Sequence, residues 1–144
     1  MSAKTVNWLD SSAVLALFLA EPGFETVRAL LAEAAKNRRE IHIAQISLVE
    51  IANSISRCYD VATAREDIRL LRELAVSIDA PTDEQCVDAG LLRSRVKLST
   101  ADAIIAIQAT AAGAELVHKD PDFESVAELE QRRLPYKSKP VRKR

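Results

Sequence analysis

Short apolar segments alternate with longer segments of helical periodicity, and this alternation constrains the fold more than any other feature of the sequence. The apolar segments predict strands at residues 5–9, 41–44, 76–79, 115–118 and 127–133. The segments between them predict helices at 11–20, 24–36, 47–57, 61–74, 81–95 and 99–113, with a short helix after residue 121. Strands that alternate with helices predict an α/β domain whose mostly parallel central sheet is covered by helices on both faces.

Composition excludes several classes of protein. Hydrophobic residues make up 48% of the 144 residues, enough for one domain with a sizeable core. Aromatic residues make up only 4%, which argues against a surface that stacks nucleic-acid bases. No apolar run reaches membrane-spanning length and no signal segment is present, so a cytoplasmic protein without membrane contact is expected. Cys58 and Cys86 are isolated from each other and from both histidines, which favours reduced thiols over a zinc or redox site.

Charge is distributed unevenly along the chain. Seven Lys and Arg residues and no acids lie between residues 132 and 144, which leaves 13 basic and 21 acidic groups in residues 1–131. We expect a folded domain over residues 1–133 and a flexible basic tail over residues 134–144. The tail could contact nucleic acid or a partner, although a solvated chain end is favoured.

Acidic residues recur at equivalent places, just beyond a strand or in the first turn of a helix. They are Asp10, Glu50, Asp102, Asp120 and Asp122. Each also has a structural interpretation: Asp10 and Asp122 as helix caps, and Glu50 and Asp102 as partners of Ser47 and Ser99 in capping boxes.

The number of these acids changes the interpretation. In parallel sheets ligands bind beyond the carboxyl ends of the strands, so the acids that follow strands should meet at one edge. Asp102 opens an apolar helix that could reach the same edge. Carboxylates gathered there repel one another unless a cation compensates their charge. Mg²⁺ or Mn²⁺ is the simplest compensation, because hard cations prefer oxygen ligands.

The order of these motifs closely resembles the PIN-domain ribonucleases, specifically the short VapC-type toxins of toxin–antitoxin pairs. The resemblance covers nearly the whole chain and rests on four segments: Leu9–Ala13, Ser47–Glu50, Leu98–Ala103 and Leu116–Phe123. Each motif is weak alone, but four in this order in a chain of this length are strong together. The resemblance implies a PIN-like three-layer sandwich and a metal-dependent endoribonuclease that hydrolyses RNA phosphodiester bonds.

Matched position by position, the resemblance places the catalytic acids at Asp10, Glu50, Asp102 and Asp120. Of these, Asp10, Asp102 and Asp120 are the expected metal ligands, and Glu50 would bind through water or orient the attacking water. Two further residues are expected beside them: Ser12 as a supporting group, and Asp122 as a supporting group or alternative ligand. The family usually has Thr or Ser at the position of His118, so a hydroxyl contact is replaced or lost here. His118 could contact a phosphate, although an ordinary histidine at a strand end is favoured.

The resemblance also implies partners. A small antitoxin usually occludes the acidic pocket, often with an Arg, and the toxin usually forms a homodimer. An apolar groove near the first helices could hold an antitoxin helix, or its residues could simply be core: Val14, Leu17, Phe18, Leu30 and Leu31. The expected substrate is a folded RNA such as tRNA or rRNA. Candidate RNA contacts, each better explained as a solvated surface charge, are Arg57, Arg93, Arg95, Lys97 and Lys119.

Three alternatives stay open at this stage. A phosphoacceptor receiver domain would need an acidic pair after the first strand, where Asp10 is followed by Ser11. A haloacid-dehalogenase-type phosphatase would need a second Asp at the position of Ser12. A catalytically inactive PIN-like scaffold that binds RNA or a protein partner would not need all four acids, and all four are present.

Overall fold

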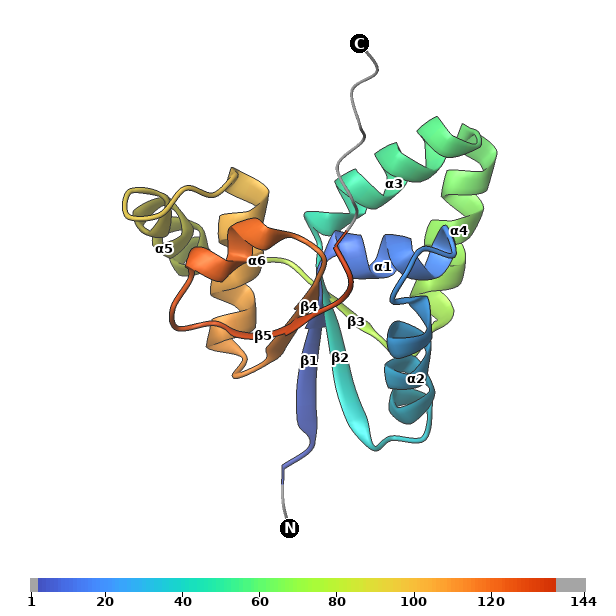
Figure 1. Cartoon of the computed structure of the whole chain (residues 1–144), viewed down its shortest axis with the longest axis horizontal. Helices are drawn as coiled ribbons and strands as arrows, with labels where there is room; N and C mark the ends of the chain where they lie inside the picture. The colour runs from blue at the N-terminus through green and yellow to red at the C-terminus, as the bar shows by residue number, and fades with distance from the viewer. Residues whose placement is uncertain (1–2, 137–144) are drawn as a thin grey trace.

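A five-stranded sheet with helices on both faces makes up the computed structural model, which describes residues 3–136 (Figure 1). The strands are β1 Thr5–Leu9, β2 Arg39–Ala44, β3 Ser77–Asp79, β4 Glu115–His118 and β5 Glu130–Arg133. Their order in the sheet is β3-β2-β1-β4-β5, and every pair of neighbours is parallel. The α/β class and the PIN-like three-layer arrangement predicted from the sequence are confirmed.

Helices cover the two faces of the sheet unequally. In Figure 1, α1 to α4 lie on one side of the strands, and α5, α6 and the 3₁₀ helix η1 lie on the other. Their bounds are α1 Ser11–Phe18, α2 Phe24–Ala35, α3 Ser47–Cys58, α4 Val61–Glu73, α5 Asp83–Arg93, α6 Thr100–Ala111 and η1 Pro121–Ser125. The predicted helices are all found, with ends that differ from the predicted ones by a few residues.

Alternating side chains of the central strands build two hydrophobic cores. Trp8 and Leu116 pack with α5, α6 and η1, whereas Leu9 and Val117 pack with the helices of the opposite face. Because β1 and β4 are buried on both faces, both strands are apolar over consecutive positions. Within residues 3–136, no helix is both long and apolar enough to cross a membrane. Cys58 and Cys86 are free and exposed.

The carboxyl ends of β1, β2 and β4 lie side by side. Leu9 pairs with Ile43 and with Val117, and the Asp10 amide donates to the Val117 carbonyl at 3.0 Å. The chain leaves β1 for α1, β2 for α3 and β4 for η1 at this edge. It is therefore the place where the acids that follow these strands meet.

Residues 137–144 lie outside the described part of the chain, so the predicted flexible tail is not tested beyond its first residues. Leu134, the first residue assigned to it, is buried, and its amide donates to the His118 carbonyl at 2.8 Å. The boundary at residue 133 stays a prediction.

Candidate active site

Asp10 is the most buried of the five acids. It caps the N-terminus of α1, and its Oδ2 accepts hydrogen bonds from the Ser12 amide at 3.2 Å and the Ser12 hydroxyl at 2.5 Å. The side chain is 3% exposed, and its other oxygen, Oδ1, is buried with no hydrogen-bond partner among the described residues. Asp10 is therefore a helix cap, as its simplest interpretation required, and it also carries one carboxylate oxygen without a partner. Such an oxygen is costly to bury unless a ligand satisfies it.

Ser12 connects Asp10 to the end of β4. Its hydroxyl donates to Asp10 and accepts the backbone N–H of Lys119 at 3.0 Å. The hydroxyl thus holds the Asp10 carboxylate against the strand that leads to Asp120, and the supporting role expected of Ser12 stays a prediction. Lys119 is itself buried, and its ammonium donates to the Pro22 carbonyl at 2.9 Å. Lys119 was predicted to be a solvated surface charge or an RNA contact, and both predictions are wrong. Its side chain is buried, and its ammonium group contacts the protein itself.

Asp102 lies in the first turn of α6, where its amide donates to the hydroxyl of the N-cap residue Ser99 at 3.1 Å. The pKa of the Asp102 carboxyl is raised to about 7, chiefly by burial and then by the neighbouring charges of Asp10, Asp120 and Glu50. A hydrogen bond with Ser99 acts in the opposite direction. The cap interpretation is correct for Ser99, but it leaves Asp102 a half-buried carboxyl facing three others.

Asp120 and Asp122 occupy the turn between β4 and η1. Asp120 caps η1, and its Oδ1 accepts the Asp122 amide at 2.9 Å. The cap of this short helix is therefore Asp120, and the interpretation of Asp122 as the cap is wrong. One carboxylate oxygen each from Asp102, Asp120 and Asp122 lie within 4.8 Å of one another, close enough to bind one cation together.

Glu50 approaches the cluster from α3. Its Oε2 accepts the Ser11 hydroxyl at 2.5 Å, and its side chain is exposed. The predicted capping box with Ser47 is wrong: the N-cap of α3 is Ile46, and the Ser47 hydroxyl is buried without a partner among the described residues. Sequence reasoning missed Ser11 as a contact of Glu50, and its place directly after Asp10 at the end of a strand was the available signal.

Burial and mutual repulsion act together on Asp10. The pKa of Asp10 is raised to about 6, chiefly by burial and less by the charges of Glu50 and Asp120, against the two hydrogen bonds from Ser12. Two carboxyls with raised pKa values in one cluster indicate a site suited to a cation or to protons. The structure thus brings together every acid that the sequence singled out. Which of them bind a metal stays a prediction.

His118 lies beneath the cluster and is fully buried. Burial lowers its pKa, and its two ring nitrogens contact the Asp120 amide and the Gln131 side chain. A direct contact with a phosphate is excluded by this burial. The favoured interpretation, a histidine at a strand end, is correct as to place, but the histidine contacts the loop that carries two of the acids.

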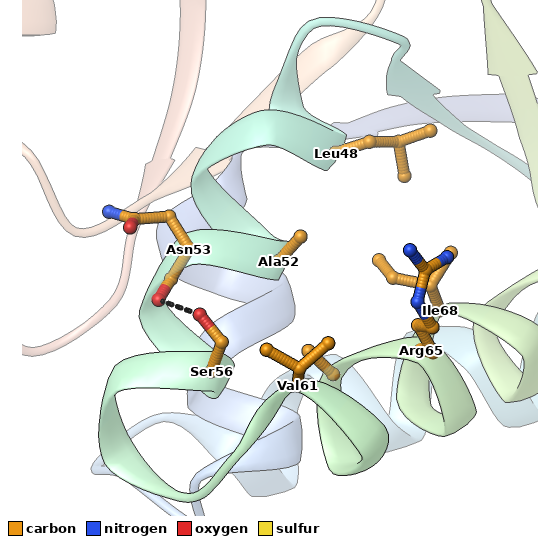
Figure 2. A pocket seen from close by; sticks show the side chains of 8 residues that line it. Leu48, Ala52, Asn53, Ser56, Val61, Arg65 and Ile68 are labelled. Carbon is orange, nitrogen blue, oxygen red and sulfur yellow. Dashed lines mark hydrogen bonds between the residues drawn. The ribbon is translucent and has the colours of Figure 1, made fainter.

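An apolar groove lies between α3 and α4, apart from the carboxylates. Figure 2 shows Leu48 and Ala52 of α3 facing Val61, Arg65 and Ile68 of α4 across it. Its volume is about 460 Å³. The residues of the groove predicted near the first helices pack into or against the core of that face. Val14 and Leu30 are buried in it, and Leu17, Phe18 and Leu31 are partly buried against it.

The fold and site define a class: an α/β protein with an all-parallel sheet and a carboxylate cluster beyond the strand ends. Within this class, the model of the PIN domain family matches residues 8–129, and the chain belongs to that family. This membership sets aside the receiver-domain and phosphatase alternatives. A search of curated proteins found no match.

Solved structures with a similar fold include toxin–antitoxin complexes. VapBC2 from Rickettsia felis, bound to a DNA fragment from its promoter, is 19% identical, with a TM-score of 0.75 over 91% of this chain and 100% of that chain. DNA-bound VapBC from Salmonella typhimurium is 13% identical, with a TM-score of 0.73 over 91% and 98%. VapC20 from Mycobacterium tuberculosis, a Sarcin-Ricin loop cleaving toxin, is 18% identical, with a TM-score of 0.70 over 85% and 95%. At these identities the likeness concerns the fold.

Proposed function

We propose that this chain is a Mg²⁺- or Mn²⁺-dependent endoribonuclease of the VapC type, the toxin of a toxin–antitoxin pair. The observation that supports it most is the meeting of five carboxylates at one sheet edge, with Asp10 Oδ1 buried and without a hydrogen-bond partner among the described residues. A cation would satisfy that oxygen and remove the repulsion within the cluster. The PIN family and the similar toxin structures support the same conclusion.

The environment of each acid suggests its role. Asp10, Asp102 and Asp120 offer the oxygens that would hold the cation, and Asp122 is near enough to replace or join them. Glu50 is more exposed and is held by Ser11, so we propose that it orients a water molecule beside the scissile phosphate. The divalent ion would supply Lewis-acid activation and would neutralise phosphate charge.

We propose a folded RNA such as tRNA or rRNA as the substrate. The chain carries a formal net charge of −1, whereas a protein that binds nucleic acid non-specifically needs an excess of positive charge. Recognition of the shape of a folded RNA depends less on such an excess. A Sarcin-Ricin loop cleaving toxin among the similar structures supports an RNA substrate.

Discrete cleavage of total cellular RNA is expected from the purified full chain with Mg²⁺ or Mn²⁺, and none with EDTA. Asp102→Asn is expected to lower the cleavage rate at least ~10³-fold, because it removes charge where the cation and the phosphate would meet. Asp88→Asn is the matched control, since Asp88 is an exposed acid on α5. The measurement is the initial cleavage rate in each lane.

Two results would change this conclusion. Intact RNA in all lanes, from folded protein shown to be free of antitoxin, would favour the inactive scaffold. Cleavage that persists in EDTA and in Asp102→Asn would mean that the acidic cluster is not the active site.

We propose that the antitoxin docks in the groove between α3 and α4. Apolar side chains line it and the Arg65 guanidinium lies at its side, so an amphipathic segment with a carboxylate would fit both features (Figure 2). We expect wild-type protein from the native host to carry a small second chain in a fixed ratio, and Ala52→Glu to lose it. Retention of the second chain by folded Ala52→Glu would place the docking surface elsewhere.

We also propose a homodimer through the outer face of α5. Val87 and Leu91 are 62% and 60% exposed there, and an added Cβ at Gly90, between them, would meet no atom within 4 Å. In an antiparallel pair, the acidic start of this helix would face the basic residues that follow its end. A one-chain mass in light scattering would contradict the dimer.

A further inference from the structure

We propose that His118 is a positioning residue that fixes the turn carrying Asp120 and Asp122, and that it acts through Gln131 on the neighbouring strand. This inference rests on the proposed function for its purpose, because the turn holds two of the carboxylates assigned to the cation. The contacts that carry it are independent of that function.

The first contact fixes the tautomer of His118. Its Nδ1 lies 3.0 Å from the backbone nitrogen of Asp120, which can only donate, so Nδ1 is the unprotonated acceptor. The ring proton therefore lies on Nε2, which donates to Gln131 Oε1 at 2.8 Å. His118 is a neutral imidazole that accepts at one nitrogen and donates at the other.

The second contact closes the connection. Gln131 Nε2 donates to the Phe123 carbonyl at 2.8 Å, so the amide uses its oxygen toward His118 and its nitrogen toward η1. The Phe123 ring in turn lies against the imidazole, with ring centroids 5.0 Å apart. The linked side chains of His118 and Gln131 thus hold the turn at both ends, at the Asp120 amide and at the Phe123 carbonyl.

The parallel pairing of β4 and β5 makes this arrangement possible. Leu116 pairs with Gln131 and His118 with Arg133, so Gln131 lies beside the strand end that carries His118. The Leu134 amide donates to the His118 carbonyl, which secures the backbone beneath the ring. The His118 side chain is fully buried, and both of its nitrogens are satisfied within the protein.

A hydroxyl at this position would make only half of the connection. Ser and Thr side chains also accept the N–H of the residue two positions later, but they are too short to reach an adjacent strand as well. The hydroxyl expected from the family resemblance is therefore replaced, and the imidazole adds the link to Gln131. We therefore expect His118→Ser to keep part of the contact with the Asp120 amide that His118→Ala loses.

The test compares His118→Ala, His118→Ser and Gln131→Leu with His42→Ala as the matched control. His42 is the other histidine and contacts Asp79 on the edge strand β3. Amide hydrogen exchange at Asp120 is measured in the full chain without metal, and Mn²⁺ affinity is measured by calorimetry. We expect His118→Ala to raise Asp120 exchange and weaken Mn²⁺ binding, each at least about tenfold, with smaller effects in His118→Ser and Gln131→Leu. His42→Ala should change neither.

Asp120 exchange and Mn²⁺ affinity within about twofold of wild type in folded His118→Ala would overturn the proposal. If that variant fails to fold, the wild type still decides, because ¹⁵N NMR of the imidazole must show the Nε2–H tautomer, and the Nδ1–H tautomer would overturn it. If wild type binds no Mn²⁺ while the exchange results hold, the proposed function fails and the positioning contact stands.

Discussion

Replacing Asp10 with asparagine is expected to stop RNA cleavage and, in the same protein, to make the metal-free fold more stable. The Asp10 carboxyl is 3% exposed, and its pKa rises from an ordinary 3.8 to about 6. A shift of two pKa units corresponds to about 3 kcal/mol of destabilisation when the carboxyl is ionised at pH 7.5. Asparagine keeps an oxygen for the Ser12 hydrogen bonds and removes the charge. We expect a gain of about 1–3 kcal/mol in the free energy of unfolding, or several degrees in Tm.

The same substitution removes the charge that would hold the cation. A loss of at least ~10³ in cleavage rate, or about 4 kcal/mol in activation free energy, is expected. Calorimetry in EDTA and the RNA cleavage assay measure the two effects, and Asp88→Asn should show neither. An Asp10→Asn protein that is less stable than wild type would contradict the destabilising effect assigned to the Asp10 charge, because asparagine caps a helix as well as aspartate does.

Local sequence signals were sufficient for the fold class and for the set of acids. Each strand is a short apolar run. Asp10 directly follows one and Asp120 lies two residues beyond another, so the parallel arrangement predicted that they meet. Asp102 was found from its place in the first turn of an apolar helix. The order of the strands was not predictable, because several crossover patterns are compatible with the same alternation.

Long-range contacts explain what the sequence did not predict. The Ser47–Glu50 spacing fits a capping box, but the Glu50 carboxylate instead accepts the Ser11 hydroxyl from another helix. The contact of His118 with Gln131 depends on the register between β4 and β5, which no local pattern specifies. Local spacing thus predicted the position of each residue in its strand or helix, whereas tertiary packing determined which groups its side chain contacts.

Without metal, the stability of the protein is expected to fall as the pH is raised from about 4 to about 7. The folded pKa values of Asp10 and Asp102 are raised to about 6 and about 7, from 3.8 in the unfolded chain. Between these values the folded state binds more protons than the unfolded state, so raising the pH favours unfolding. The cost is absent below about pH 3 and complete above about pH 8, roughly one unit beyond the unfolded and folded pKa values.

Other groups act in the opposite direction, so the comparison must be made against a variant. The lowered pKa of buried His118 destabilises the fold as the pH falls below about 6.5. Unfolding free energies of wild type and Asp10→Asn, measured in EDTA from pH 4.5 to 7.5, remove this shared contribution. The unfolding free energy of Asp10→Asn should increase relative to that of wild type as the pH rises. Parallel curves would contradict the raised pKa of Asp10.

Added metal should reverse the trend, and this connects stability to the proposed chemistry. A cation binds the ionised carboxylates, so Mg²⁺ or Mn²⁺ should raise Tm much more at pH 7.5 than at pH 5. At one hundred times the Kd, the expected gain is about 2.7 kcal/mol. Asp102→Asn should lose most of this gain, whereas Asp88→Asn should keep it. An equal metal effect at both pH values would mean that the cation binds elsewhere. The metal effect is expected to depend on pH because the carboxylate charges that destabilise the metal-free protein are the ones assigned to bind the ion.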